Sequence, residues 1–194
     1  AVAAEQNISL TVSTFEMLDA IEKAAPQKLK IHIKVDTGMH RQGFQEWEIE
    51  KVIERLKKLT DSGGAVASGV IVEGLFTHFG AAKNPSFRAA TQKQLDRFTL
   101  WRKAFEDAGI KAIVHAAASG GAMIFPESHF DLVRFGISIY GLWPSAEAKA
   151  FMSADEGAAS AAPGKISLKP ALTWKTLIGE VKQVKKGERV GYDF

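Results

Sequence analysis

The sequence contains no cysteine, so neither a disulfide nor a thiolate metal site can form. It also lacks any apolar run close to the ~20 residues that a membrane-spanning helix needs, and we expect no membrane partner. Basic and acidic residues nearly balance, 25 against 22, and the net charge of +3 is too small and too dispersed to favour a nucleic-acid partner. A chain without cysteine fits a reducing compartment, and we expect a cytoplasmic protein.

Three further features are missing from the sequence. No His-x-His or His-x-x-x-His pair occurs, and such pairs commonly mark metal ligands, so we predict no metal site. The first residues, Ala1 to Ala4, have neither the charged nor the apolar region of a signal peptide. The chain also does not start with Met, and we expect it to begin inside a longer polypeptide.

The composition is that of an ordinary globular protein. The chain has 194 residues, of which 46% are hydrophobic and 24% charged, enough to build a sizeable core.

The segment from Lys30 to Phe44, KIHIKVDTGMHRQGF, begins with a clear strand pattern. Ile31, Ile33 and Val35 alternate with His32, Lys34 and Asp36. Side chains two residues apart share a face of a strand, so we predict one aliphatic face, covered by helices, and one polar face. Arg41 follows just after the turn at Thr37-Gly38, where a barrel loop would carry it over the site.

Strand-like and helix-like segments alternate along most of the chain. The predicted strands are 7–12, 30–36, 70–79, 112–118 and 132–142, and the predicted helices are 13–25, 46–59 and 92–108. This alternation predicts a right-handed parallel α/β fold. A complete (β/α)8 barrel takes ~250 residues, so two solutions remain: an open five-stranded sheet, or a barrel without its first three units.

The pattern changes after Pro144. Residues 145–165 are rich in Ala, Ser, Gly and Glu, which predicts a loose helix or linker, and residues 172–184 and 189–194 are predicted as strands with no helix between them. We therefore divide the chain into an α/β portion at 1–144, a linker at 145–167 and the start of an all-β domain at 168–194.

Several polar residues follow the predicted strands, and each has an ordinary structural interpretation. His78 can be a partly buried histidine with satisfied hydrogen bonds, and Ser119 before two glycines can be a helix N-cap or part of a phosphate site with the Gly136-Ile137 turn. Arg134 can pair with Asp131 or another carboxylate.

Lys34 and Tyr192 also have ordinary interpretations. Lys34 can contact Asp36 or Glu73, and Tyr192 can pack at a sheet edge.

Several of these segments resemble those of alanine racemases, the fold-type III enzymes that use pyridoxal phosphate. The matching segments are KVDTGMHR at 34–41, EGLFTHF at 73–79, VHAAASGG at 114–121, RFGISIYG at 134–141 and VGY at 190–192. The resemblance favours the partial barrel and implies interconversion of L- and D-alanine, which supplies D-alanine for peptidoglycan, by a cytoplasmic homodimer with composite active sites.

The resemblance also assigns roles to residues at the cofactor. It implies that His78 stacks beside the pyridoxal ring and acts in proton transfer, and that Ser119, Gly136 and Ile137 hold the phosphate. Arg134 then faces the pyridine nitrogen. His115, two residues from Ala117, supports Arg134 from behind. Ala118 stands where many members have Asn.

Three further roles concern the substrate side. The resemblance implies a carbamate on Lys34 that holds Arg41, which then reaches the phenolic oxygen and the substrate carboxylate. It implies that Tyr192 is a catalytic acid/base in the partner subunit's site. Asp193 replaces the usual second Gly after that tyrosine.

One part of the family's machinery does not occur in these residues. The lysine that anchors the cofactor lies in a K-x-N-A-Y-G-H type motif, which this sequence does not contain. We therefore predict that the chain alone is inactive. Two alternatives remain: a non-catalytic pyridoxal-phosphate-binding barrel protein, or a fold-type III racemase or decarboxylase for another amino acid.

Overall fold

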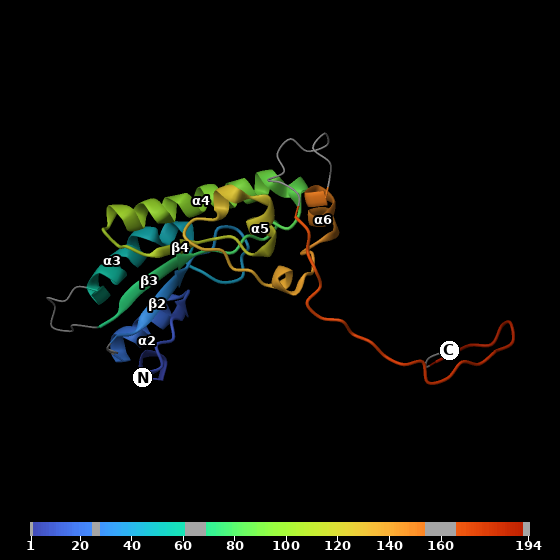
Figure 1. Ribbon diagram of the computed structural model, residues 1–194. Coiled ribbons are helices and arrows are strands. Elements are labelled where there is room, and N and C mark those ends of the chain that lie inside the picture. Colours follow the sequence, from blue (N-terminus) through green and yellow to red (C-terminus); the bar gives the residue numbers. More distant parts are fainter. Residues whose placement is uncertain (1, 25–27, 61–68, 154–165, 192–194) are drawn as a thin grey trace.

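The computed structural model describes residues 2–24, 28–60, 69–153 and 166–191 (Figure 1). The strands are β1 (Leu10–Val12), β2 (Lys30–Lys34), β3 (Ile71–Phe76) and β4 (Ile113–His115). The α-helices are α1 (Val2–Glu5), α2 (Phe15–Ala24), α3 (Ile49–Thr60), α4 (Arg88–Asp107), α5 (Ser119–Ile124) and α6 (Ala146–Ser153). Short 3-10 helices span Glu46–Glu48, Pro85–Phe87, Pro126–Ser128 and Ile137–Tyr140.

The four strands form one parallel sheet in the order β1-β2-β3-β4. One long helix follows each of the first three strands: α2 after β1, α3 after β2 and α4 after β3. Each parallel pairing therefore uses a helical crossover, as the strand and helix patterns of the sequence predicted.

The two faces of the sheet differ in chemistry. Ile31 and Ile33 are fully buried and belong to a single hydrophobic core with Leu56 of α3 and Phe98 and Trp101 of α4. Alternate residues of the same strands turn to the opposite face, which is polar. In the part of the chain that the structure describes, helices cover the aliphatic face and leave the polar face free of them, the arrangement of a (β/α) barrel portion. The predicted division between the two faces of residues 30–36 is confirmed.

The predicted fifth strand at 132–142 is wrong. This segment pairs with the sheet through one isolated parallel bridge, between Ala118 and Arg134, and then turns into the 3-10 helix Ile137–Tyr140. Gly136 and Gly141 depart from extended geometry, with φ of −114° and +77° and ψ of −103° and +17°, and so bound that turn. The alternating apolar pattern does not form a strand here, because a strand needs a continuous partner for its backbone groups.

The predicted strand at 172–184 is also absent from the structure. Residues 166–191 contain no regular helix or strand and run away from the α/β body (Figure 1). Trp174 and Leu177 are more than 90% exposed. The described residues offer this segment no neighbouring strand, so its sequence pattern alone cannot produce a sheet. The domain division at 145–167 stays a prediction.

Candidate functional site

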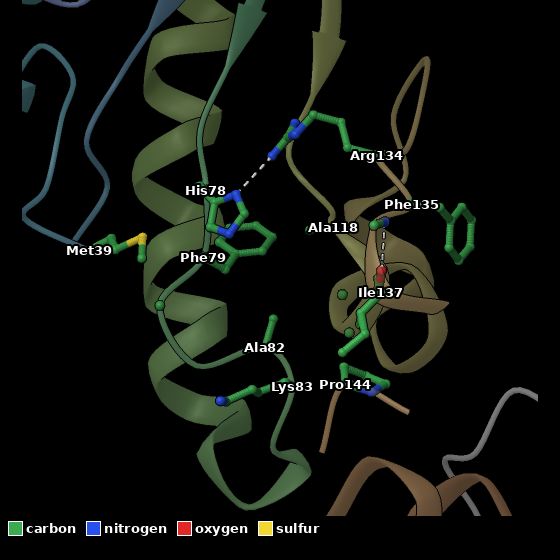
Figure 2. A pocket seen from close by; sticks show the side chains of 15 residues that line it. Met39, His78, Phe79, Ala82, Lys83, Ala118, Arg134, Phe135, Ile137 and Pro144 are labelled. Atoms are coloured by element: carbon green, nitrogen blue, oxygen red, sulfur yellow. Dashed lines mark hydrogen bonds between the residues drawn. The ribbon is translucent and has the colours of Figure 1, made fainter. Parts of the chain in front are cut away.

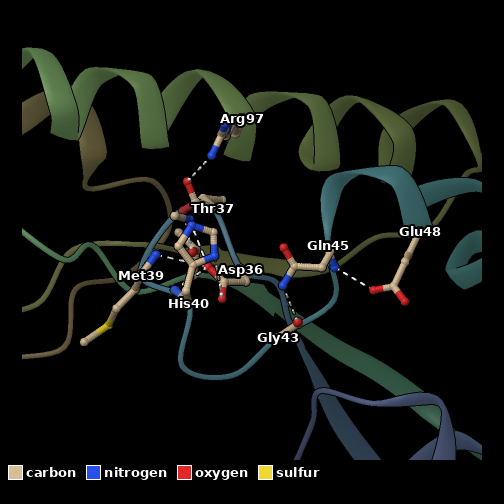
Figure 3. Close-up of polar contacts among 10 residues, drawn as sticks. Asp36, Thr37, Met39, His40, Gly43, Gln45, Glu48 and Arg97 are labelled. Atoms are coloured by element: carbon tan, nitrogen blue, oxygen red, sulfur yellow. Dashed lines mark hydrogen bonds and ion pairs between the residues drawn. The ribbon is translucent and has the colours of Figure 1, made fainter.

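The loop after β2 is organised by the carboxylate of Asp36 (Figure 3). The backbone N–H groups of Gly38, Met39 and His40 all donate to Asp36 Oδ1, at 2.9, 3.0 and 3.1 Å. Burial alone would raise the pKa of Asp36, but these N–H groups outweigh it and lower that pKa. An ionised carboxylate thus fixes the turn that carries Arg41.

The base of this loop is closed by backbone contacts. The Asp36 N–H donates to the Phe44 carbonyl at 2.8 Å, and the Phe44 N–H donates to the Lys34 carbonyl at 3.0 Å. Gly43 has a φ of +126°, and a Cβ there would lie 2.5 Å from the Asp36 nitrogen. Only glycine fits this close approach, so the loop geometry requires glycine at position 43.

Lys34 lies on the polar face with little contact to water. Lys34 is 6% exposed, and its Nζ lies 5.1 Å from the centre of the Phe76 ring. Burial, followed by the charges of Arg41 and Arg134, lowers the pKa of Lys34. The pairing with Glu73 that the sequence left open is not formed, because Glu73 pairs with Lys30 at 3.0 Å.

Strand register aligns three side chains of the polar face. Lys34 is level with Phe76 on β3, and Phe76 is level with His115 on β4. The rings of Phe76 and His115 stack with centroids 4.8 Å apart and planes within 5°. Phe76 therefore forms the wall between the ammonium group of Lys34 and the imidazole of His115.

Arg134 is the group on which most contacts converge. Its Nη2 donates to the carbonyls of Thr77 at 2.7 Å and Ala116 at 2.9 Å, and lies 3.4 Å from His78 Nδ1. Its Nη1 lies 2.6 Å from His115 Nδ1. Burial lowers the pKa of Arg134, but a guanidinium with such partners stays protonated at neutral pH.

Asp131, the carboxylate that the sequence offered to Arg134, has a different partner. It accepts a hydrogen bond from the Val114 N–H at 2.7 Å. Arg134 is thus a cation held by carbonyls and imidazoles.

Two further residues continue the contacts behind His115. His115 Nε2 lies 3.0 Å from His32 Nδ1, and His32 Nε2 lies 3.1 Å from Glu73 Oε2. Burial, with the charges of Arg134 and His32, lowers the pKa of His115 to about 4, so it is neutral at pH 7. The polar face therefore carries a line of groups from Glu73 to Arg134.

The Ser119 hydroxyl ties two segments together beside this face. Ser119 is the first residue of α5, and its Oγ accepts a hydrogen bond from the Gly136 N–H at 2.9 Å. Gly120 packs on the Lys83 backbone, where a Cβ would come within 2.8 Å of the Lys83 Cα. The small residues after Ser119 thus let three loops approach one another.

These loops enclose a cavity of about 550 Å³ (Figure 2). Five of the residues singled out in the sequence line it: His78, Ser119, Arg134, Gly136 and Ile137. Figure 2 shows His78 and Arg134 at one end, with Lys83 and Pro144 toward the other. Burial, followed by the charges of Arg134, Lys34 and Arg41, lowers the pKa of His78, so the cavity contains a neutral imidazole at pH 7.

Other predicted site residues lie elsewhere. Arg41 is exposed on the loop after β2 and does not line the cavity, although its charge acts on His78 and Lys34. Lys34 and His115 lie behind the cavity on the polar face. Tyr192 and Asp193 fall outside the described residues.

Sequence reasoning gave no role in the site to several of its residues, including Met39, Lys83, Phe76 and His32. Met39 and Lys83 line the cavity, while Phe76 and His32 build the polar face behind it. The alternation in β2 already placed His32 beside Lys34. The register that brings Phe76 level with both Lys34 and His115 is a tertiary property that a single strand pattern does not contain.

No group of three or more His, Cys, Asp or Glu side chains in 2–24, 28–60, 69–153 and 166–191 is arranged to hold a metal ion. Over the same residues, no helix is both long and apolar enough to cross a bilayer.

Comparisons with known proteins agree on one family. Residues 1–144 match the family model described as alanine racemase, N-terminal domain. The chain is 37% identical over 194 residues to an alanine racemase of Desulforamulus reducens, covering 98% of this chain and 47% of that protein. It is 36% identical over 193 residues to one of Methanococcus maripaludis, covering 97% and 46%. The chain spans about half the length of the curated relatives it matches.

Solved structures give the same result. The alanine racemase of Bacillus anthracis with bound L-Ala-P superposes with a TM-score of 0.76 at 31% identity, covering 98% of this chain and 45% of that one. That of Corynebacterium glutamicum gives 0.73 at 27% identity, covering 96% and 46%.

Proposed function

The chain belongs to the alanine racemase family, and we propose that it supplies one side of the active site of an enzyme that interconverts L- and D-alanine with pyridoxal phosphate. The observation that carries the proposal is the shared cavity. His78, Ser119, Arg134, Gly136 and Ile137 come from three separate segments of the chain and line one space of about 550 Å³. A volume of this order suits a small cofactor with a small substrate.

The donor set of the cavity fits this cofactor. The Ser119 hydroxyl and the backbone at Gly136-Ile137 suit the phosphate, and the Arg134 guanidinium suits the pyridine nitrogen. The chemistry that such a cofactor supplies is withdrawal of electrons from the Cα of an attached amino acid, which acidifies the Cα proton. A guanidinium donates hydrogen bonds but does not release its protons near neutral pH, so Arg134 would donate a hydrogen bond to the ring nitrogen without protonating it.

The remaining residues act on the substrate side. His78, kept neutral by burial and by Arg134, is able to pass a proton to or from a neighbouring group near pH 7. Tyr192 is proposed as the acid/base on one face of the substrate, working in the partner subunit's site of a homodimer. Arg41 is proposed to receive the substrate carboxylate, with Asp36 holding its loop in place.

Lys34 is proposed to carry a carbamate. In this modification the unprotonated Nζ attacks the carbon of CO2, the N–C bond forms as one C=O π bond opens onto oxygen, and water takes the proton that the nitrogen releases, leaving an anionic carbamate. Burial and the charges of Arg41 and Arg134 favour this step because they lower the pKa of Lys34 and raise its neutral fraction. The resulting anion would neutralise the cations that surround it.

The names of the relatives support alanine over another amino acid as the substrate. We propose that the D-alanine serves peptidoglycan synthesis in the cytoplasm. The alternative of a non-catalytic barrel shares the cofactor cavity. A protein made of the barrel alone would end before the VGY segment at 190–192, so the presence of this segment favours the racemase.

A titration of the chain with pyridoxal phosphate, followed by fluorescence, tests the proposal. We expect saturable binding that weakens roughly tenfold or more in R134L and roughly three- to tenfold in S119A, because each loses polar contacts to the cofactor. R102Q is the matched control, because Arg102 lines a different cavity. No binding by the unmodified chain, or equal weakening by R102Q and R134L, would count against the proposed site.

A further inference from the structure

The line of contacts from Arg134 to Glu73 has a fixed direction. A guanidinium only donates hydrogen bonds, so Arg134 Nη1 donates to His115 Nδ1 across 2.6 Å. A neutral imidazole whose Nδ1 accepts carries its proton on Nε2. His115 Nε2 therefore donates to His32 Nδ1, and His32 Nε2 in turn donates to Glu73 Oε2.

Glu73 is held as a permanent acceptor at the end of this line. Lys30 Nζ lies 3.0 Å from its Oε1, and the Ser9 hydroxyl donates to its Oε2. The hydrogen bonds from Ser9 and Lys30 are the main causes that lower the pKa of Glu73 to about 2. An ionised carboxylate has no proton to donate, so Glu73 only accepts hydrogen bonds while Arg134 only donates them. Both ends of the line therefore require the hydrogen bonds to run from Arg134 to Glu73.

Gly74, the residue after Glu73, leaves the space that the His32 ring occupies. The register of β2 with β3 pairs Ile31 with Val72 and His32 with Gly74, so Glu73 is the extra residue of a β-bulge. The His32 ring lies over Gly74, where a Cβ would come within 2.2 Å of His32 Nδ1. A side chain at 74 would push His32 out of reach of both His115 and Glu73.

We infer that Glu73 is a positioning residue: acting through His32 and His115, it sets the tautomers that present an acceptor to Arg134 and so holds the guanidinium at the cavity. Glu73 lies outside the cavity and touches Arg134 only through two imidazoles. Without the carboxylate, His32 is free to carry its proton on Nδ1. Two N–H groups, His32 Nδ1–H and His115 Nε2–H, would then face each other. If His115 instead moved its proton to Nδ1, that N–H would face the N–H of Arg134 Nη1. The effect on the cofactor rests on the proposed function, while the tautomers themselves do not.

Nuclear magnetic resonance of the imidazole nitrogens in the 15N-labelled chain tests the inference without any cofactor. At pH 7 we expect both His32 and His115 as Nε2–H tautomers. In E73L we expect His32 to lose this preference and His115 to become a mixture. E73Q should restore the wild-type pattern, because an amide oxygen also accepts from His32 Nε2–H. E54Q is the control, since Glu54 pairs with Lys58 on the surface.

The outcomes separate clearly. An Nδ1–H or doubly protonated ring at position 32 or 115 in the unmodified chain overturns the inference, and that spectrum decides the direction even if E73L does not fold. Unchanged tautomers in folded E73L overturn it as well. A pyridoxal phosphate titration is the second readout, with affinity expected to fall roughly three- to tenfold in E73L and to recover in E73Q. Wild-type tautomers as expected without cofactor binding would leave this inference standing and contradict the proposed function.

Discussion

At the scale of single residues, the site depends on one buried imidazole that must stay neutral. His115 is 5% exposed, stacks on Phe76 and faces the guanidinium of Arg134. A proton on its Nδ1 would place two donors against each other. The lowered pKa of His115, about 4, follows from burial first and from Arg134 second.

This imidazole makes stability depend on pH. The unfolded chain binds a proton on this histidine below its ordinary pKa of 6.5, while the folded chain does not until about pH 4. The contribution is therefore complete above pH 6.5 and is lost as the pH falls toward 4. We expect the free energy of unfolding in urea to drop by about 3 kcal/mol across this window.

The dependence should belong to His115 itself. H115F, which keeps a ring for Phe76 to stack on, should flatten this part of the pH profile. A profile of the same slope in H115F would contradict the assignment.

At the scale of elements, the loop after β2 depends on a single side chain, Asp36. In D36A the N–H groups of Gly38, Met39 and His40 lose a shared charged acceptor. We expect stability to fall by about 2 kcal/mol and these three amides to exchange hydrogen faster, as measured by hydrogen-exchange mass spectrometry or NMR. D107A is the control, since Asp107 pairs with Lys103 on the surface of α4. Faster amide exchange in this loop of D107A, or unchanged amide exchange in D36A, would argue against this role of Asp36.

Elements with a strong repeating pattern could be predicted from the sequence, and the others could not. The alternation at 30–36 predicted the aliphatic and polar faces of β2, and the segments 46–59 and 92–108 were predicted as helices where α3 and α4 form. The same alternation at 132–142 gave a wrong strand, since strand formation there depends on a neighbour and not on the segment itself. The bulge at Glu73 was also not predicted, because a bulge is a relation between two strands.

The candidate site was predictable to a similar extent. Strand ends pointed to His78 and Ser119, because the carboxyl ends of parallel strands meet at one rim. Their meeting in one cavity with Arg134, and the line from Arg134 to Glu73, depend on strand order and register. Neither property is contained in a local pattern.

At the scale of the whole molecule, the proposed site draws on one part of the family's machinery. The K-x-N-A-Y-G-H type motif that carries the cofactor lysine in the family does not occur in its 194 residues. We expect no racemisation above the protein-free rate when the purified chain is incubated with L-alanine and pyridoxal phosphate and D-alanine is measured by chiral chromatography. A full-length alanine racemase is the positive control, and D-alanine formed by the chain at a rate proportional to its concentration would refute the prediction.

The parallel order of the sheet has a consequence for how the molecule folds. His32 and His115 are 83 positions apart in the chain, and every strand pairing must wait for a helical crossover to close a long loop. The chain entropy lost in these closures is recovered only once all four strands are aligned. The polar line can therefore assemble only late, after the sheet, and the imidazole resonances of these two residues should report the final step of refolding.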